Sequence, residues 1–206
     1  MKLLAIDSSI LTNTSVSRQL TRSFVSRWQK IYPETEVVYR DLHAQPINHL
    51  SQKILAANSV PSTQISAEIR EEMNLSMQLI SELLSASVLV IGAPMYNFSI
   101  PSQLKSWIDR IVVAGKTFKY VDGKVQGLAT GKRAYILSSR GGFYNAESAL
   151  NLDHQERYLT SILNFIGISD ITFIRAEGVS VGEEIRTQSL HQAEAKIQKL
   201  LQFQMA

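Results

Sequence analysis

The sequence has no cysteine among its 206 residues. This excludes disulfide bonds, thiolate metal sites and cysteine nucleophiles, and it is compatible with a reducing compartment. Long apolar runs are also missing. The opening "MKLLAID" has one lysine and then a run of four apolar residues before Asp7, fewer than the about seven of a secretory signal, and no stretch approaches the ~18 apolar residues of a membrane span. We therefore expect a soluble, cytoplasmic protein.

Runs of one charge sign are equally scarce. The net charge is +3 and the isoelectric point about 9.1, but lysine and arginine are scattered and never form a run of five, so no nucleic-acid partner is expected. The four histidines stand in neither metal-ligand nor triad spacing, and we interpret them as ordinary surface or loop residues; they are His43, His49, His154 and His191. We predict no metal site and assign no side chain as an obligate acid or base.

What the sequence does contain is a regular alternation of strand and helix patterns. Strand patterns occupy residues 2–7, 36–42, 87–94, 133–139 and 171–178, and helical patterns occupy 15–32, 66–84, 99–111, 154–167 and 183–203. Ser99 is the expected N-cap of the third helix, with Pro101 in its first turn. The alternation predicts an α/β fold, a doubly wound parallel sheet in one domain spanning 1–206. In such a sheet, ligands bind beyond the carboxyl ends of the strands.

The loop after the first strand is rich in hydroxyl groups. Its "SSILTNTSVS" lacks the glycine-rich fingerprints of dinucleotide sites and P-loops. A helix N-terminus still offers free backbone N–H groups and a positive dipole end, and the hydroxyls add donors, which suits a phosphate. Taken alone, the loop is better explained as an ordinary N-cap with a polar turn.

The loops after the third and fourth strands suit a flat ring. Met95, Tyr96 and Phe98 offer apolar faces for stacking, and Asn97 can both donate and accept. In "SSRGG", the paired glycines permit close backbone approach to a planar ligand. Core filling and a plain turn are the alternatives when each loop is considered alone. Together the three loops indicate a phosphate at one end and a planar heterocycle at the other, as in a mononucleotide flavin.

Several segments resemble one family over essentially the whole chain. "APMYNFSIPSQLKSWID", "SSRGG", "SSI" with "SVS", and "RDL…PI" resemble the FMN-dependent NADH:quinone oxidoreductases, also known as azoreductases. The resemblance implies a flavodoxin-like fold with five parallel strands in the order 2-1-3-4-5 and helices on both faces. It also implies that FMN is held by its phosphate at Ser9, Ser15, Val16 and Ser17, by its ring system at Met95, Tyr96, Asn97 and Phe98, and by its pyrimidine side at Ser139, Arg140, Gly141 and Gly142.

The resemblance further implies an activity. Two electrons would pass from NADH or NADPH to quinones, and to aromatic azo compounds, by a ping-pong mechanism. The family forms homodimers, so we predict that a hairpin around Asp122-Gly123 brings Phe118 and Tyr120 to a substrate pocket at the subunit interface. The stretches 57–65 and 142–153 are not matched and are expected to influence acceptor preference. A flavodoxin-type electron carrier, which would be expected to be acidic, and a cofactor-free binding module are the rival functions.

Overall fold

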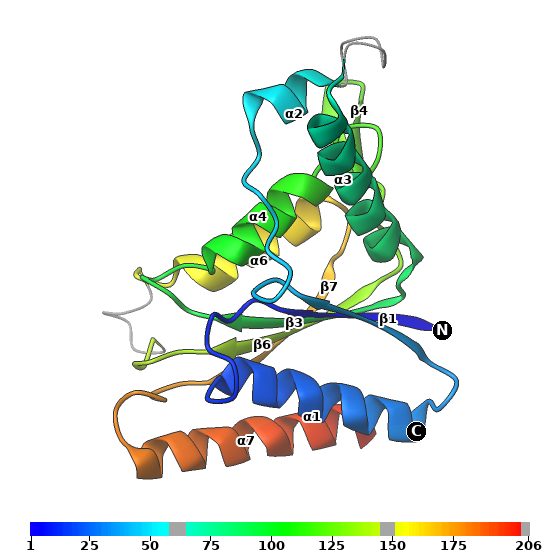
Figure 1. The fold of residues 1–206 in the computed structure, drawn as a ribbon. Coiled ribbons are helices and arrows are strands. Elements are labelled where there is room, and N and C mark those ends of the chain that lie inside the picture. Colours follow the sequence, from blue (N-terminus) through cyan, green and yellow to red (C-terminus); the bar gives the residue numbers. More distant parts are fainter. Residues whose placement is uncertain (58–64, 145–150, 203–206) are drawn as a thin grey trace.

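A parallel sheet forms the centre of the computed structural model, which describes residues 1–57, 65–144 and 151–202 (Figure 1). Its strands lie in the order β2-β1-β3-β6-β7. Their bounds are β1 Lys2–Asp7, β2 Glu36–Asp41, β3 Val88–Pro94, β6 Arg133–Ser139 and β7 Asp170–Ala176. The predicted order 2-1-3-4-5 is confirmed, because β4 and β5 form a separate hairpin between the third and fourth strands of the sheet.

Helices cover both faces of this sheet (Figure 1). On one face lie α1 Val16–Ile31 and α7 Glu183–Gln202; on the other lie α3 Ala67–Ser85, α4 Ser102–Ile111 and α6 His154–Phe165. The two faces carry separate hydrophobic clusters. On β3, Leu89 and Ile91 belong to the cluster under α3, α4 and α6, whereas Val88 and Val90 belong to the cluster under α1 and α7. The continuous apolar run of β3 therefore follows from burial on both sides.

Two local predictions differ from the structure. Ser99 does not cap α4: its amide and carbonyl bond to Tyr96, and the helix begins at Ser102 with Pro101 as N-cap. A short helix, α2 (Gln52–Ala56), lies between the predicted strand 36–42 and the predicted helix 66–84, where the sequence pattern assigned no helix. The loop residues 58–64 and 145–150, expected to influence acceptor preference, lie outside the described residues.

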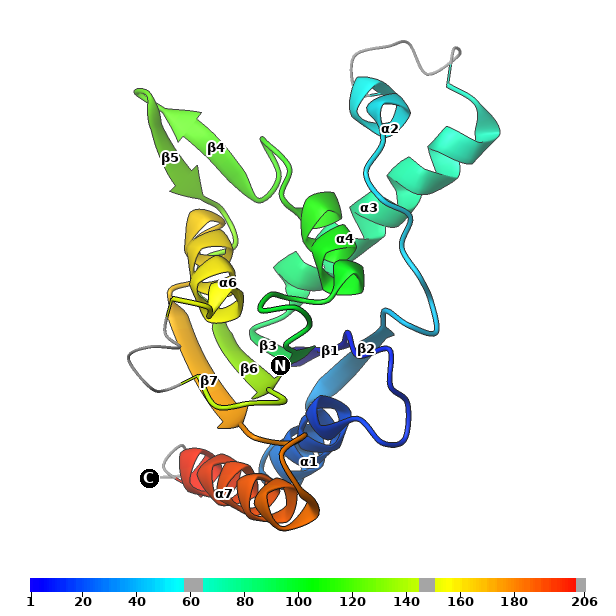
Figure 2. The same ribbon diagram turned by 90° about the vertical axis from the view of Figure 1, so that its left-hand side faces the viewer.

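The predicted hairpin is confirmed and stands apart from the sheet (Figure 2). Its strands are β4 Phe118–Val121 and β5 Lys124–Gly127, and both turn residues, Asp122 and Gly123, have positive φ angles of 50° and 73°. Two positive φ values are typical of the tight turn that an Asp-Gly pair favours. Within the described ranges, no helix has the length and apolar character needed to cross a bilayer.

Candidate functional site

The start of α1 carries hydrogen-bond donors that have no partner inside the helix. Ser15 is the N-cap, and its hydroxyl accepts a bond from the Arg18 amide at 3.3 Å. The Ser17 hydroxyl lies 3.2 Å from that of Ser15, and both side chains are buried. The amides of Val16 and Ser17 belong to the first turn, where no helical carbonyl is available to them. Together with the positive end of the helix dipole, these groups can bind an anion.

Ser9 adds to these donors and connects them to the loop after β3. Its hydroxyl accepts a bond from the Leu11 amide at 3.2 Å and lies 3.2 Å from the hydroxyl of Tyr96. The Tyr96 hydroxyl also accepts a bond from the Ile10 amide at 3.3 Å. The structure thus brings two of the predicted site residues together from loops 87 residues apart. We refer to Ser9, Ser15, Val16 and Ser17 together as the anion site.

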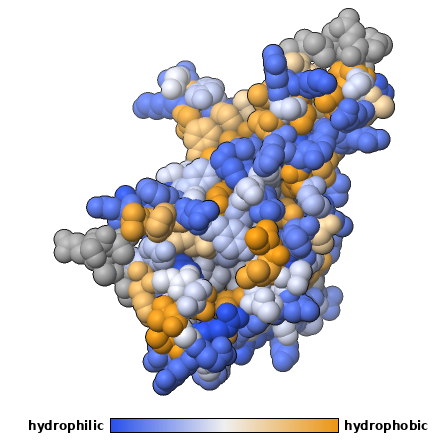
Figure 3. Space-filling view, turned by 60° about the vertical axis from the view of Figure 1, so that its left-hand side comes forward, coloured by the Kyte–Doolittle hydropathy of each residue, from blue (hydrophilic) through white to orange (hydrophobic). Residues whose placement is uncertain are grey.

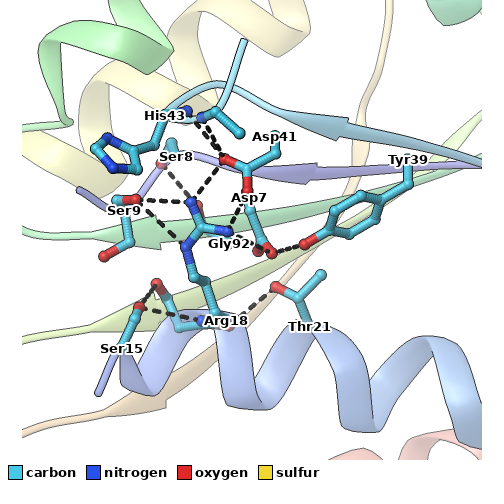
Figure 4. A network of polar contacts seen from close by, with 12 residues as sticks. Asp7, Ser8, Ser9, Ser15, Arg18, Thr21, Tyr39, Asp41, His43 and Gly92 are labelled. Atoms are coloured by element: carbon cyan, nitrogen blue, oxygen red, sulfur yellow. Dashed lines mark hydrogen bonds and ion pairs between the residues drawn. The ribbon is translucent and has the colours of Figure 1, made fainter. Parts of the chain in front are cut away.

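A buried charged network lies behind the anion site (Figure 4). Asp7 and Asp41 are neighbours in register at the carboxyl ends of β1 and β2. The Arg18 guanidinium donates to both Asp41 oxygens at 2.6 Å and lies 3.5 Å from Asp7. It also donates to the Ser9 carbonyl through Nη2 at 2.9 Å and through Nε at 3.3 Å. One side chain therefore joins the ends of two strands to the first turn of α1.

The two carboxyl groups of this network differ in their affinity for protons. The hydrogen bonds from Arg18 hold the pKa of Asp41 down at about 2. Burial raises the pKa of Asp7 to about 6, although Arg18 opposes that rise. The Tyr39 hydroxyl donates to Asp7 Oδ2, and Oδ1 has no hydrogen-bond partner among the described residues. Of these two carboxyl groups, Asp7 therefore titrates nearer to neutral pH.

This network was not predicted from the sequence, although a signal was present. Asp7 is the last residue of one predicted strand and Asp41 the last but one of the next, and carboxylates at the ends of adjacent parallel strands require a cation nearby. Arg18 is the first basic residue after β1. The pattern of two strand-terminal aspartates and one arginine at a helix start would have pointed to it.

The loop after β3 is a tight turn that exposes its two central side chains. Tyr96 and Ser99 exchange two backbone hydrogen bonds of 3.0 Å. Between them, Asn97 and Phe98 have φ angles of 48° and 67°. A positive φ is unusual for a bulky aromatic residue and costs conformational energy, which makes the turn a candidate for function. The Met95 amide donates to the Ser139 carbonyl at 2.8 Å and joins this turn to the next loop.

In that next loop, the Arg140 side chain points into the protein. The residue is 2% exposed, and its guanidinium forms ion pairs with carboxylates from the start of α6 and the end of β7. These partners are Asp153 at 2.9 Å, Glu177 at 3.3 Å and Glu156. The resemblance places Arg140 at the flavin, but its side chain is engaged elsewhere. Its backbone is bonded as well, because the amide donates to the Ala176 carbonyl at 2.9 Å and the carbonyl accepts from the Val179 amide at 3.0 Å.

The two glycines that follow contribute available amides, and their backbone conformation is ordinary. Neither Gly141 nor Gly142 has a positive φ. Their carbonyls accept bonds from Ser180 at 3.1 Å and Gly178 at 2.9 Å. Their amides have no acceptor within the part of the chain that the structure describes. The glycine loop is thus anchored through its oxygens, and its two amides remain available to a ligand.

The two predicted pocket residues of the hairpin lie away from these loops. Phe118 is buried against Phe165, with ring centroids 4.6 Å apart, and Tyr120 is 66% exposed. The hairpin follows the end of α4, whereas the Met95–Phe98 loop precedes its start, and Figure 2 shows the two at opposite ends of that helix. The structure therefore does not bring Phe118 and Tyr120 to the carboxyl edge of their own chain.

The available donors fit FMN. Amides without an acceptor among the described residues occur at the anion site for a phosphate and at Gly141 and Gly142 for the polar edge of a ring, with the exposed Phe98 between the two loops. The Arg18 charge is offset by carboxylates, so a phosphate would be held by hydroxyls and amides. A doubly wound parallel sheet with such an edge defines a flavodoxin-like protein.

Comparison with known proteins gives the same class. The family profile described as "Flavodoxin-like fold" matches residues 1–201. A curated protein of Legionella pneumophila subsp. pneumophila (strain Philadelphia 1), named FMN-dependent NADH:quinone oxidoreductase, is 98% identical over 206 residues, the whole of both chains. A protein of the same name from Methylocella silvestris is 50% identical over 201 residues, covering 97% of this chain and 98% of its own.

A solved structure extends the likeness to three dimensions. The FMN-dependent NADH-azoreductase from Bacillus anthracis str. Ames Ancestor, in complex with FMN, superposes with a TM-score of 0.89 at 25% identity. The match covers 98% of this chain and 97% of that one. The chain therefore belongs to the family of FMN-dependent NADH:quinone oxidoreductases within the flavodoxin-like fold, and the resemblance drawn from the sequence is confirmed.

Proposed function

We propose that this chain is an FMN-dependent NADH:quinone oxidoreductase that also cleaves aromatic azo compounds reductively. FMN, when bound, supplies the redox chemistry by accepting two electrons from a reduced nicotinamide and delivering them to the acceptor. One observation carries the proposal: backbone donors without a partner among the described residues lie in the loops after β1 and β6, with the strained turn of Asn97 and Phe98, after β3, between them. The names of the relatives support the same activity.

The anion site would hold the phosphate. The amides of Val16 and Ser17 and the hydroxyls of Ser9, Ser15 and Ser17 are donors that need no side-chain cation. Because Ser15 and Ser17 are buried, bulk water competes little with a phosphate for hydrogen bonds from their hydroxyls. This end of the site therefore binds and orients the cofactor.

The Met95–Phe98 loop and the glycine loop would hold the ring system. Phe98 is 43% exposed although it packs edge-on against Tyr144, so its remaining face is available for stacking. The amides of Gly141 and Gly142 would stabilise negative charge that develops at the polar edge of the ring, as donors of an oxyanion hole do. Ser139 and Arg140 would contribute through backbone position, since the Arg140 side chain is bound to carboxylates.

Donor and acceptor would use one open surface in turn. The exposed side chains of the Met95–Phe98 turn are an amide and an aromatic ring, and neither carries a charge that would select a particular substituent. Such a surface suits flat quinones of many kinds, and azo compounds as slower substrates that need successive reductions. Because the two substrates exclude each other from this surface, they react in alternation and give ping-pong kinetics. NADH is the expected electron donor, and NADPH is the alternative donor to test.

A second copy of the chain would complete this surface. Tyr120, Val121 and Val125 leave apolar area exposed on the hairpin, at 66%, 43% and 42%. In Figure 3 the hairpin is the projecting lobe at the upper left, where apolar side chains lie next to hydrophilic ones. Because the hairpin lies far from its own carboxyl edge, it can serve a flavin pocket only in a partner. We propose a homodimer in which Phe118 and Tyr120 of one chain line the pocket of the other. The cytoplasmic location stays a prediction.

Steady-state and anaerobic kinetics test the activity. With NADH varied at several quinone concentrations, double-reciprocal plots should be parallel, and anaerobic NADH should bleach the flavin before any acceptor is added. Intersecting lines would indicate a ternary complex and two separate pockets. Failure of both NADH and NADPH to bleach the flavin would overturn the oxidoreductase function in favour of an electron carrier.

A further inference from the structure

Arg18 occupies a position that the proposed function leaves unexplained. It lies in the first turn of α1, beside the anion site, where a cation would attract a phosphate directly. Its side chain is nevertheless almost entirely buried, and Figure 4 shows it extending from α1 towards the ends of β1 and β2. An arginine that contacted the phosphate would have to give up these partners.

The charge of Arg18 is already compensated. Nη1 and Nη2 bond the two oxygens of Asp41 at 2.6 Å, and Asp7 lies 3.5 Å from Nη1. The low pKa of Asp41 means that this partner is ionised throughout the physiological range. Since Asp41 alone offsets one positive charge, the network offers no net attraction to an anion.

What remains is geometry. The donors not used by carboxylates, Nε and one hydrogen of Nη2, both go to the Ser9 carbonyl, at 3.3 and 2.9 Å. That carbonyl belongs to the residue whose hydroxyl forms part of the anion site. The Arg18 backbone amide donates to the hydroxyl of Ser15, in the same site, at 3.3 Å. Arg18 therefore holds the strand side and the helix side of the anion site at a fixed separation.

We propose that Arg18 is a positioning residue for the flavin phosphate, acting through the Ser9 carbonyl and without contact to the ligand. The inference rests on the proposed function, because it presupposes a flavin at this edge. It assigns the Asp41 carboxylate a role as well: by accepting both Nη bonds, it fixes the plane of the guanidinium so that Nε and Nη2 meet Ser9. Gly92 of β3 packs directly against the network, because a Cβ at this position would collide with the side chains of Asp7 and Thr21.

A positioning role differs from a merely structural one in its ligand dependence. Riboflavin has the same ring as FMN but no phosphate. Loss of general stability would weaken both ligands, whereas a displaced anion site would weaken FMN alone. The ratio of the two affinities is therefore the informative quantity.

The test is a titration of the full-length protein with FMN and with riboflavin, for the wild type, Arg18→Lys and Arg27→Lys. Arg18→Lys keeps the positive charge, but a single ammonium group cannot donate to both Asp41 oxygens and to the Ser9 carbonyl in the geometry of a guanidinium. Arg27 lies on the same helix and forms a 3.3 Å ion pair with Glu194 remote from the site, so it controls for the loss of an arginine from α1. We expect Arg18→Lys to lower FMN affinity by about tenfold or more and to change riboflavin affinity by less than about twofold, with Arg27→Lys unchanged for both.

Asp41→Asn provides a second approach if Arg18→Lys folds poorly. This substitution releases the guanidinium from its carboxylate and should lower the ratio of FMN affinity to riboflavin affinity, even though it makes the charge of the network more positive. An unchanged or raised ratio in both variants would overturn the positioning role. A wild-type protein that binds neither flavin would overturn the proposed function itself, whereas one that prefers FMN while its variants keep that preference would overturn this inference alone.

Discussion

The two ends of the candidate site are built in opposite ways. At the phosphate end, Ser15 and Ser17 are 2% and 0% exposed, and Arg18 joins three elements through buried hydrogen bonds. At the ring end, Asn97 and Phe98 are exposed and sit in a turn with positive φ angles. If the proposed function holds, this contrast would let one end keep its ligand while the other stays open to substrates that must enter and leave.

The contrast has an energetic basis. Buried polar groups are costly unless they are paired, so the phosphate end is fixed by its own network before any ligand arrives. The ring end leaves aromatic surface in water, which costs little by itself but gains when a flat molecule covers it. A change at the phosphate end should therefore affect cofactor retention or folding, and a change at the ring end should affect turnover.

Ser17→Asp should disrupt the phosphate end most severely. A carboxylate placed against a phosphate dianion, with the Arg18 charge already offset by Asp41, should lower FMN affinity at least about a hundredfold. Riboflavin affinity should change little. The helix itself should tolerate the change, since acidic residues are favourable in a first turn. Fluorescence titration with both flavins measures the effect.

Ser26→Asp is the matched control, because it adds the same charge to an exposed position of α1. It should leave FMN affinity within about twofold. If Ser17→Asp bound FMN as tightly as the wild type, the start of α1 would be an ordinary N-cap and the phosphate would have to lie elsewhere.

Asp7→Asn should change how the stability of the folded protein depends on pH, because it removes a buried carboxyl group. The folded-state pKa of Asp7 is raised from 3.8 to about 6, so the folded protein binds this proton more tightly than the unfolded chain does. Stability is therefore lost as pH rises from about 4 to about 6, by about 3 kcal/mol in total. The substitution removes that loss, so the stability of the variant relative to the wild type should rise across this range and then level off.

Urea unfolding of the flavin-free protein between pH 4 and 8 measures this difference. The opposite contribution of Asp41, whose lowered pKa costs stability only as pH falls below about 4, is common to both proteins and cancels. A difference that does not vary with pH would mean that Asp7 is ionised in the folded state like an exposed aspartate.

Gly92→Ala should destabilise the same end by about 1–3 kcal/mol through overpacking. A Cβ at Gly92 would lie 2.6 Å from Thr21 Oγ1 and 2.8 Å from Asp7 Oδ1. Gly182→Ala is the control, because among the described residues no atom beyond Gly182 itself and its two chain neighbours lies within 4 Å of its added Cβ. Thermal unfolding should separate the two variants, and equal stability would show that the Asp7 network can shift aside.

The fold could be predicted further than the site, for a physical reason. The apolar run of β3 and the stripe of Leu20, Phe24 and Trp28 on α1 are local patterns of the sequence. The predicted strand 87–94 and helix 15–32 therefore agree with β3 and α1, because burial follows periodicity. The start of α4 was misplaced because a positive φ at Phe98 lets the chain turn before the helix, and no propensity signals such a conformation in an aromatic residue.

Within the site, residue types could be predicted but side-chain directions could not. The hydroxyls near Ser15 and the aromatics near Tyr96 were found because their composition is unusual for loops. The engagement of Arg140 with Asp153, Glu156 and Glu177 could not be foreseen, since those partners come from other segments of the chain. Arg18 was missed for the same reason: its role depends on partners that only the folded sheet brings together.

Tyr120→Ala should have the smallest effect and should act only at the ring end. The side chain is 66% exposed and contacts Phe118 edge-on at 5.8 Å, so its removal should change stability by less than about 0.5 kcal/mol and leave FMN affinity unaltered. If the hairpin lines the pocket of a partner chain, KM for a quinone should rise about three- to tenfold, since one aromatic stacking contact contributes about 0.5–1.5 kcal/mol. Lys119→Ala, a neighbouring exposed position of β4, is the control and should change neither constant. A monomeric mass in solution, or an unchanged KM in a dimer, would remove the hairpin from the pocket and leave the ring end open to water within a single chain.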